Sequence, residues 1–231
     1  MRTTTPAVIT VWGDFACWTK PECKVERLSY PVPTPSGIRG LLASIYSKPP
    51  EFYWQVKKIE VLNPIQFTTF KRNEVKKKLS YNKSNPSKSL IDIEDVKKVR
   101  TQRQSVVLKD VRYRITAEMV LRPEYRGIPK HLYDQFERRV KTGQNFLQPS
   151  MGTREFPAYY EWGDMGELPI QESMDLGLML YDVFDLHKWK VGKKAEPSVS
   201  LYRASMERGV IQVPPYDSPL VLKPGKGART C

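Results

Sequence analysis

A lysine and a histidine stand next to each other where the sequence predicts the start of a helix. In the stretch "GIPKHLYDQFERRVKTGQNF", residues 127–146, Lys130 and His131 follow a glycine and a proline, which are typical of the turn before a helix. A helix N-terminus and a neighbouring ammonium group both disfavour imidazolium, so we expect a neutral His131 that can accept a proton. The same helix end would present backbone N–H groups to a phosphate. The pair therefore suits acid–base chemistry on a phosphate ester.

Cleavage of RNA is a reaction that such groups can promote without a metal ion. RNA supplies its own nucleophile, the 2′-hydroxyl. An enzyme must add a base for the hydroxyl proton, a cation beside the phosphate and an acid for the leaving 5′-oxygen. The sequence lacks the GxxxxGK[ST], GxSxG, GxGxxG and HExxH patterns of other catalytic sites. With two histidines, three cysteines and only Glu94 and Asp95 as a weak acidic pair, we expect no metal and no cofactor.

The positive charge is concentrated in the first two thirds of the chain. The protein has 38 lysines and arginines against 25 acidic residues, a net charge of +13. Residues 163–231 carry nine of each sign, so the whole excess lies in residues 1–162. This asymmetry is typical of a surface that binds a polyanion such as nucleic acid, although a basic face can also serve solubility alone.

The apolar pattern predicts the elements that position the candidate groups. Residues 7–13 alternate as in a strand, and a helix begins after Thr34, a capping residue, with Pro35 at its first position. This helix ends before Pro49, which leaves Tyr46 in its last turn. The expected buried stripe of the helix is Ile38, Leu41, Leu42 and Ile45.

The rest of the first 162 residues predicts two further strands, a second helix and a final strand. Residues 51–67 indicate one long strand or a strand pair, and residues 71–105 resemble a basic, solvated loop or hairpin tip. The second helix starts at the Lys130–His131 pair and ends at Gly143, and a glycine turn then leads into a strand that ends at residue 162. Val111, Tyr113, Ile115 and Ala117 form one face of the strand before this helix, and Leu132, Phe136 and Val140 form the buried stripe of the helix.

The order strand, helix, strand, strand, helix, strand predicts an α+β fold. The arrangement βαββαβ is that of ferredoxin-like domains, which include the RNA-recognition motif. We expect one such domain over residues 1–162, with a basic insertion at about 71–105. Residues 163–231 predict a small, mostly antiparallel β subdomain.

The remaining bulk features favour a cytoplasmic protein. No run of about 18 apolar residues is present, and the first residues lack an apolar core with a small-residue cleavage site. Cysteines are odd in number and without a CxxC pair, so we expect neither a disulfide framework nor a zinc site. No membrane partner is expected.

Four stretches in the same order resemble a known family. They are "GDFACWTKPECKVERLSYPVPTPSGIRGLLASIYSKP", "KIEVLNPIQFTTFKRNEV", "LKDVRYRITAEM" and "FERRVKTGQNFLQPSMGTREFPAYYEW". Together they are similar to the Cas-five subunit of type I-C CRISPR systems (the d, or Dvulg, variety). The likeness spans most of residues 8–162 and continues weakly into "SLYRASMERGVIQVP".

The resemblance implies a fold, an activity and a set of partners. It implies a ferredoxin-like domain with a small β extension that cleaves the hairpin repeats of precursor CRISPR RNA without a metal ion. The subunit then stays on the 5′ handle of the mature guide RNA, beside the backbone and large subunits of a surveillance complex that meets target DNA indirectly. The implied catalytic residues are Tyr46 in "SIYSKP" and Lys130 and His131 in "PKHLYDQFERR".

Several basic side chains are expected to bind the RNA. They are Lys24, Arg27, Arg39, Arg72, Lys76, Lys77, Lys78, Arg138, Arg139 and Arg154. Arg154 follows Gly152 in a turn whose backbone N–H groups could contact a phosphate.

Alternatives remain open at this stage. Tyr46 could serve only to pack its ring, and Lys130 could clamp a phosphate without taking part in the chemistry. The whole chain could also be a non-catalytic subunit that binds the guide-RNA handle, or a basic nucleic-acid-binding protein of ribosomal type.

Overall fold

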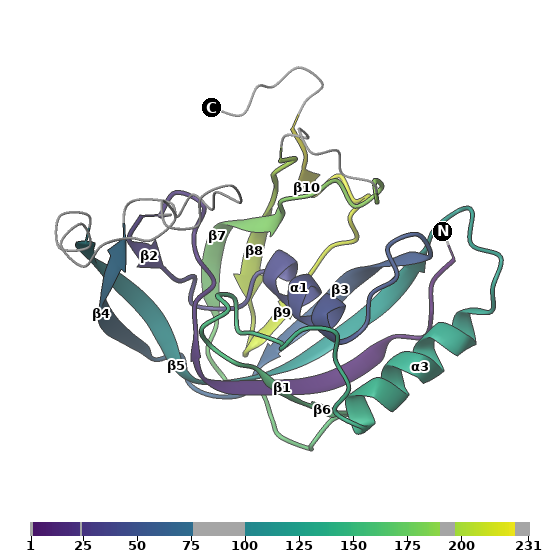
Figure 1. Ribbon diagram of the computed structural model, residues 1–231, viewed down its shortest axis with the longest axis horizontal. Helices are drawn as coiled ribbons and strands as arrows, with labels where there is room; N and C mark the ends of the chain where they lie inside the picture. Colours follow the sequence, from purple (N-terminus) through teal and green to yellow (C-terminus); the bar gives the residue numbers. More distant parts are fainter. Residues whose placement is uncertain (1, 24, 76–99, 190–196, 225–231) are drawn as a thin grey trace, which may run out of the picture.

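Two helices and two antiparallel sheets make up the described part of the chain. The computed structural model describes residues 2–23, 25–75, 100–189 and 197–224. The predicted mixed α/β fold with antiparallel sheets is confirmed, and neither described helix is long and apolar enough to span a membrane. The elements are β1 (Ala7–Ala16), β2 (Arg27–Leu28), α1 (Pro35–Ile45), β3 (Phe52–Val61), β4 (Phe67–Val75), β5 (Arg100–Leu121), α3 (Pro129–Lys141), β6 (Tyr159–Trp162), β7 (Met174–Asp182), β8 (Ser200–Met206), β9 (Val210–Gln212) and β10 (Val221–Leu222), as drawn in Figure 1.

The larger sheet is built around the long strand β5. Its strands run in the order β6-β1-β5-β3-β9, while β2 and β4 pair with the first half of β5. All neighbours are antiparallel except β2, which is parallel to β5. Helix α1 packs against β3, α3 packs against β6, and the helices contact each other. The predicted face of β5 is confirmed, because Val111, Tyr113, Ile115 and Ala117 are buried.

Strand β1 extends beyond the predicted end at Gly13. The glycine lies inside the strand and pairs with Val111 of β5. A side chain at this position would come within 2.8 Å of the carbonyl oxygen of Pro157. Gly13 therefore permits a close approach of the segment before β6 and does not end the strand.

Helix α1 begins as the sequence predicts. The backbone N–H of Gly37 donates to Oγ1 of Thr34 at 3.1 Å, and Pro35 is the first helical residue. Tyr46 follows the helix as its C-cap and does not lie in the last turn, although its N–H still donates to the carbonyl oxygen of Leu42. The predicted stripe of Ile38, Leu41, Leu42 and Ile45 is buried.

The basic segment at 71–105 is more regular at both ends than predicted. Residues 71–75 complete β4 and residues 100–105 begin β5, and the two strands pair from Phe67 opposite Leu108 to Val75 opposite Arg100. Residues on both faces of this hairpin are polar, which hides the alternation of the strands from sequence reasoning. Residues 76–99 lie outside the described residues.

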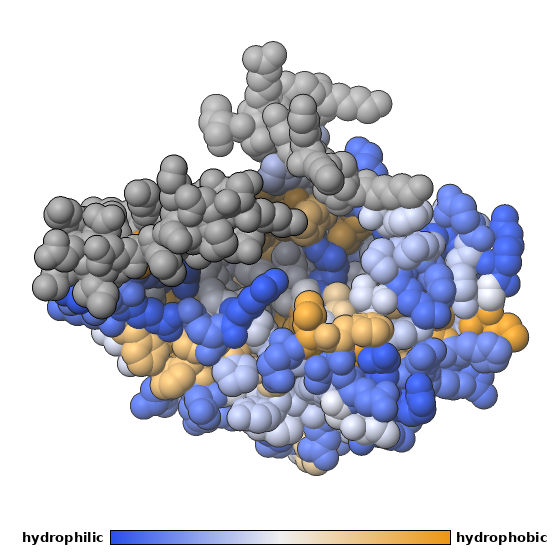
Figure 2. Space-filling model, in the orientation of Figure 1, coloured by the Kyte–Doolittle hydropathy of each residue, from blue (hydrophilic) through white to orange (hydrophobic). Residues whose placement is uncertain are grey.

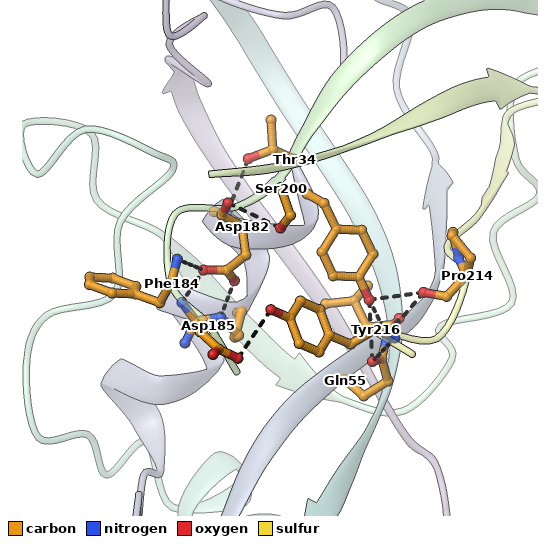
Figure 3. A network of polar contacts seen from close by, with 12 residues as sticks. Thr34, Gln55, Asp182, Phe184, Asp185, Ser200, Pro214 and Tyr216 are labelled. Atoms are coloured by element: carbon orange, nitrogen blue, oxygen red, sulfur yellow. Dashed lines mark hydrogen bonds and ion pairs between the residues drawn. The ribbon is translucent and has the colours of Figure 1, made fainter. Parts of the chain in front are cut away.

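The C-terminal third contributes to both sheets. Strands β7, β8 and β10 form the smaller sheet, whereas β9 returns to the edge of the larger sheet beside β3. The division at residue 163 therefore remains a prediction. Polar contacts join the two parts, because the hydroxyl of Tyr181 and the backbone N–H of Tyr216 both donate to Oε1 of Gln55 on β3; Gln55 and Tyr216 are labelled in Figure 3.

Candidate active site

Helix α3 is held by three apolar side chains on one face. Leu132, Phe136 and Val140 are buried as predicted. The ring of Phe136 lies 4.6 Å from that of Trp54 and 5.8 Å from that of Trp162, measured between centroids. These contacts fix the rotation of the helix and so decide which of its polar residues face outward.

Lys130 and His131 are exposed in the first turn of α3. Ile128 precedes the helix and provides no side-chain cap, and the first turn has no acidic residue. Among the described residues, neither side chain makes a hydrogen bond or an ion pair. The surface at the lower right of Figure 2, where α3 lies in Figure 1, is largely hydrophilic. The positive end of the helix, an ammonium group and an imidazole thus face solvent together.

Tyr46, the C-cap residue of α1, is buried. Its side chain is 1% exposed, its ring lies 5.5 Å from that of Phe52, and its carbonyl oxygen accepts a hydrogen bond from Nε1 of Trp54 at 2.8 Å. The buried hydroxyl has no hydrogen-bond partner among the described residues. Such a group loses its hydration without compensation, which costs about 1–3 kcal/mol. The packing of the ring does not need this hydroxyl, because phenylalanine would pack in the same way without the cost.

The sequence did not single out Lys48, which lies near the hydroxyl of Tyr46. Burial raises the pKa of Tyr46, and the positive charge of Lys48 partly opposes this effect. The Lys48 ammonium donates to both carboxylate oxygens of Glu51, at 3.1 and 3.3 Å, and this contact raises the pKa of Lys48. Lys48 acts on the hydroxyl through its charge and through a close side-chain interaction, although the two groups do not meet the geometry of a full hydrogen bond. The spacing Tyr46, Lys48, Glu51 is a local signal that could have been used.

Arg139 connects α3 to the end of α1. Its guanidinium lies 5.8 Å from the ring centroid of Tyr46 and 4.1 Å from that of Phe146, and Nη1 donates to the carbonyl oxygen of Ile45 at 3.2 Å. His131 stands eight residues earlier, about 12 Å along the axis and about 80° around it. Tyr46 thus contacts the later part of α3, while the Lys130–His131 pair occupies its start. No described contact joins Tyr46 to either residue of the pair.

Two predicted RNA ligands, Arg27 and Arg72, lie in an ion-pair network on the β4–β5 hairpin. Arg27 is 3.1 Å from Glu155 and 3.7 Å from Glu74, and Arg72 also pairs with Glu155. Arg103, which stands opposite Arg72, is 3.1 Å from Glu74. Three arginines thus meet two carboxylates, and most of their charge is already compensated within the protein.

Arg39 has a structural partner in the smaller sheet. Its Nε and Nη2 atoms lie 2.5 and 2.9 Å from the two carboxylate oxygens of Asp182, which is 1% exposed. The Asp182 carboxylate also accepts from the N–H of Phe184 at 2.9 Å (Figure 3). This bidentate pair joins α1 to β7.

The other predicted RNA ligands differ in their surroundings. Arg138 and Arg154 are exposed, and Lys24, Lys76, Lys77 and Lys78 lie outside the described residues. Gly152 has a φ of +84°, and a side chain there would come within 2.0 Å of the carbonyl oxygen of Cys17. The turn before Arg154 therefore requires glycine.

A groove runs from this turn along α1. It is lined by Ser36, Gly40, Ser44, Leu147 and Arg154, among others. Small residues of α1 leave room for a backbone to approach, and Arg154 adds a cation. Within the described ranges, no three histidine, cysteine or acidic side chains are grouped so as to hold a metal ion.

Comparison with known proteins identifies relatives over most of the chain. The family model of a CRISPR-associated protein (Cas_Cas5) matches residues 8–214. A protein of Mannheimia succiniciproducens named CRISPR pre-crRNA endoribonuclease Cas5d is 40% identical over 220 residues, which are 89% of this chain and 93% of the relative. A protein of the same name from Thermus thermophilus is 48% identical over 177 residues, 76% of this chain and 72% of the relative.

A solved structure has the same fold. It is described as a CRISPR-associated protein, covers 96% of this chain and 98% of its own, and superposes with a TM-score of 0.65 at 19% identity. The family predicted from the four stretches is thereby confirmed: the chain belongs to the CRISPR-associated Cas5d family.

Proposed function

We propose that this protein is an endoribonuclease that cleaves the hairpin repeats of precursor CRISPR RNA. The two relatives described above carry this activity in their names. The observation that carries the proposal within this chain is the start of α3, where Lys130 and His131 are exposed and have no side-chain partner among the described residues. The first turn there has no side-chain cap and no acidic residue. A phosphate at this end would meet backbone N–H groups, an ammonium and an imidazole together.

The proposed reaction needs no metal ion. The 2′-oxygen attacks the adjacent phosphorus after its proton passes to a base, and the bond from phosphorus to the 5′-oxygen breaks as that oxygen receives a proton from an acid. The products are a 2′,3′-cyclic phosphate and a 5′-hydroxyl. His131 supplies one of the two proton transfers, and Lys130 compensates the charge that builds up on the phosphate oxygens.

Tyr46 is the second proton-transfer group in this proposal. Its unpaired hydroxyl and the nearby Lys48 support a functional role. Because the hydroxyl of Tyr46 is buried, it must become accessible before it can exchange a proton with RNA. Lys130 and His131 are already exposed, so they can contact RNA without such a change.

The central strands support a ferredoxin-like reading of the fold. The order β6-β1-β5-β3 is antiparallel throughout, with α1 between β1 and β3 and α3 between β5 and β6. This is the strand and helix order predicted for the first domain. We propose that the hairpin of β4 with β5 and the C-terminal strands are additions to that domain.

After cleavage, the protein is proposed to remain on the 5′ handle of the guide RNA. It would do so in the cytoplasm, beside the backbone and large subunits of a type I-C surveillance complex, and would meet target DNA only through that complex. The excess of positive charge in residues 1–162 supports lasting contact with RNA.

A non-catalytic, handle-binding subunit is the second candidate. Two observations favour this second candidate. The hydroxyl of Tyr46 is buried, and Tyr46 contacts α3 at Arg139, eight residues after His131. Incubation of the purified protein with repeat RNA in excess EDTA separates the two functions. We expect one cleavage site, products with a cyclic phosphate, and no cleavage when the nucleotide before the cut carries a 2′-deoxy sugar. Intact RNA after binding would favour the non-catalytic subunit.

A further inference from the structure

A cavity of about 430 Å³ lies between the end of β5 and the segment that follows β7. Its lining includes Tyr53, Arg122, Glu124, His187 and Trp189. A second cavity of about 200 Å³ adjoins it and shares Tyr53, Arg122 and Trp189. The larger one falls within the range of about 300–1000 Å³ that holds a small ligand.

Arg122 brings a cation to the lining of the cavity. The residue is 6% exposed, its Nε donates to the carbonyl oxygen of Pro49 at 3.2 Å, and its Nη1 donates to that of Leu186 at 2.6 Å. Nη2 donates to none of the described residues, and no described carboxylate lies within ion-pair distance. Burial lowers the pKa of Arg122, although Tyr53, Glu124 and Asp185 act against this. A buried cation that has no ion-pair partner among the described residues is costly, and an anionic ligand would offset that cost.

Flat rings surround this charge. The Arg122 guanidinium lies 5.0 Å from the ring centroid of Tyr53. His187 is held in place because its Nε2 is 2.7 Å from Oδ1 of Asp217, and its ring lies 6.4 Å from that of Tyr53. Trp189 is 43% exposed at the mouth. Of these three rings, that of Trp189 is exposed enough for a nucleobase to stack against it.

A second cation stands at the same mouth. The side chain of Lys188 is 76% exposed, and its ammonium is 3.3 Å from the carboxylate of Asp185. An exposed ion pair of this kind is weak, so the ammonium can also contact a phosphate. Arg122, which follows β5, stands eight positions before Lys130 of the candidate active site in the sequence.

We propose that this cavity binds one unpaired nucleotide that flanks the repeat hairpin, with its base against Trp189 and its phosphate toward Arg122 and Lys188. The assignment rests on the proposed function, because it names a part of the RNA that the protein would bind. It adds a second contact on the substrate, away from the cut itself.

Binding of two RNAs to the Trp189→Ala protein tests the proposal. One RNA is the repeat hairpin with unpaired flanks and the other is the hairpin alone, both with a 2′-deoxy sugar at the cleavage site so that binding is measured without cleavage. We expect Kd for the flanked RNA to rise about tenfold, in keeping with loss of one base stack. Kd for the bare hairpin should stay within twofold. Trp12→Ala, which alters a half-buried tryptophan that stacks on Tyr159 of β6, is the matched control and should change neither value.

The outcomes separate this proposal from the proposed function. Equal Kd values of wild type and Trp189→Ala for the flanked RNA, or an equal loss for both RNAs, would overturn the nucleotide site while leaving cleavage untouched. Cleavage can fail in its own assay while the flank effect persists. Quenching of Trp189 fluorescence by a free nucleoside monophosphate at lower concentration than by the flanked RNA would replace the RNA with a free ligand and so overturn the proposal. Thermal melting of Trp189→Ala and Trp12→Ala excludes unfolding as the cause of any change. Lys188→Gln leaves every aromatic ring of the cavity in place and should raise Kd for the flanked RNA alone.

Discussion

The two histidines of the chain stand in contrasting regions. His131 lies at the start of α3, exposed and without a side-chain partner among the described residues, whereas His187 is bound to Asp217 at the cavity near the smaller sheet. The same contrast separates the arginines, because Arg138 is exposed on α3 while Arg39 is paired with Asp182. The groups at the start and outer flank of α3 have no carboxylate partner among the described residues, whereas carboxylates of the C-terminal region hold Arg39 and His187 in place.

This difference decides which histidine is assigned to catalysis. A proton-transfer group must reach the substrate and change its protonation during the reaction. A ring nitrogen held by a carboxylate at 2.7 Å is already engaged, and its imidazole is better placed to orient a bound base. The predictions below test the contrast, beginning with the largest effect.

Replacement of His131 should have the largest effect on the rate. Binding energy is spread over many basic groups, but proton transfer depends on one positioned side chain that supplies roughly 10²- to 10⁴-fold of rate. We expect His131→Ala to bind repeat RNA nearly as tightly as wild type and to cleave it at least about a hundredfold more slowly, on the order of 3 kcal/mol. Single-turnover rates measured beside dissociation constants give both quantities.

His187→Ala is the matched control for this prediction. It should cleave within a few-fold of wild type, because its ring is expected to contact the flanking nucleotide and not the cut. A loss of rate in His187→Ala with normal cleavage by His131→Ala would reverse the assignment of the two histidines.

Tyr46→Phe should reduce the rate about a hundredfold without reducing stability. The substitution removes only a hydroxyl that has no full hydrogen bond to any described residue, so the free energy of unfolding should stay equal or rise by about 1 kcal/mol. Chemical denaturation and single-turnover cleavage measure the two effects on the same preparation. A normal rate would mean that the ring only packs, and a lower stability would mean that the hydroxyl has a structural partner after all.

Local signals predicted the helices well. The cap at Thr34, the proline after it and the stripe from Ile38 to Ile45 lie within one turn or two of each other, so the sequence contains the whole argument for α1. The stripe of Leu132, Phe136 and Val140 did the same for α3. The strand after residue 105 was found because one of its faces is apolar.

Pairings between distant segments could not be predicted in the same way. Arg39 and Asp182 are separated by 143 positions, and nothing near Arg39 indicates that its charge is compensated. The tip of the β4–β5 hairpin, residues 71–74 and 100–105, is polar on both faces, so these residues carry no apolar period that distinguishes a strand from a loop. The candidate pair on α3 was predictable as exposed, but the burial of Tyr46 depends on packing between α1, α3 and β3.

Arg39→Gln should affect the stability of the protein, whereas Arg138→Gln should affect its binding of RNA. Removal of Arg39 leaves the buried carboxylate of Asp182 without its cation, and we expect a loss of about 3 kcal/mol in the free energy of unfolding, with RNA affinity of the folded protein unchanged. Arg138→Gln should leave stability within about 0.5 kcal/mol and weaken RNA binding. Denaturation curves and binding isotherms at one salt concentration measure both. Weaker RNA binding by Arg39→Gln at unchanged stability would return Arg39 to the RNA-binding surface.

The smallest effect is expected in the dependence of RNA binding on salt. Each lysine that contacts a phosphate contributes about 0.7 to 0.9 to the slope of log affinity against log salt, because it releases counterions. Replacement of Lys76, Lys77 and Lys78 by glutamine should therefore flatten the slope by about 2 to 3 if all three contact phosphates. Arg72→Gln should change it by less than one contact, since Arg72 is already paired with Glu155. An unchanged slope in the triple variant would mean that these lysines do not contact RNA. A larger change in Arg72→Gln would mean that RNA displaces Glu155, so that a group paired within the protein becomes available to the ligand.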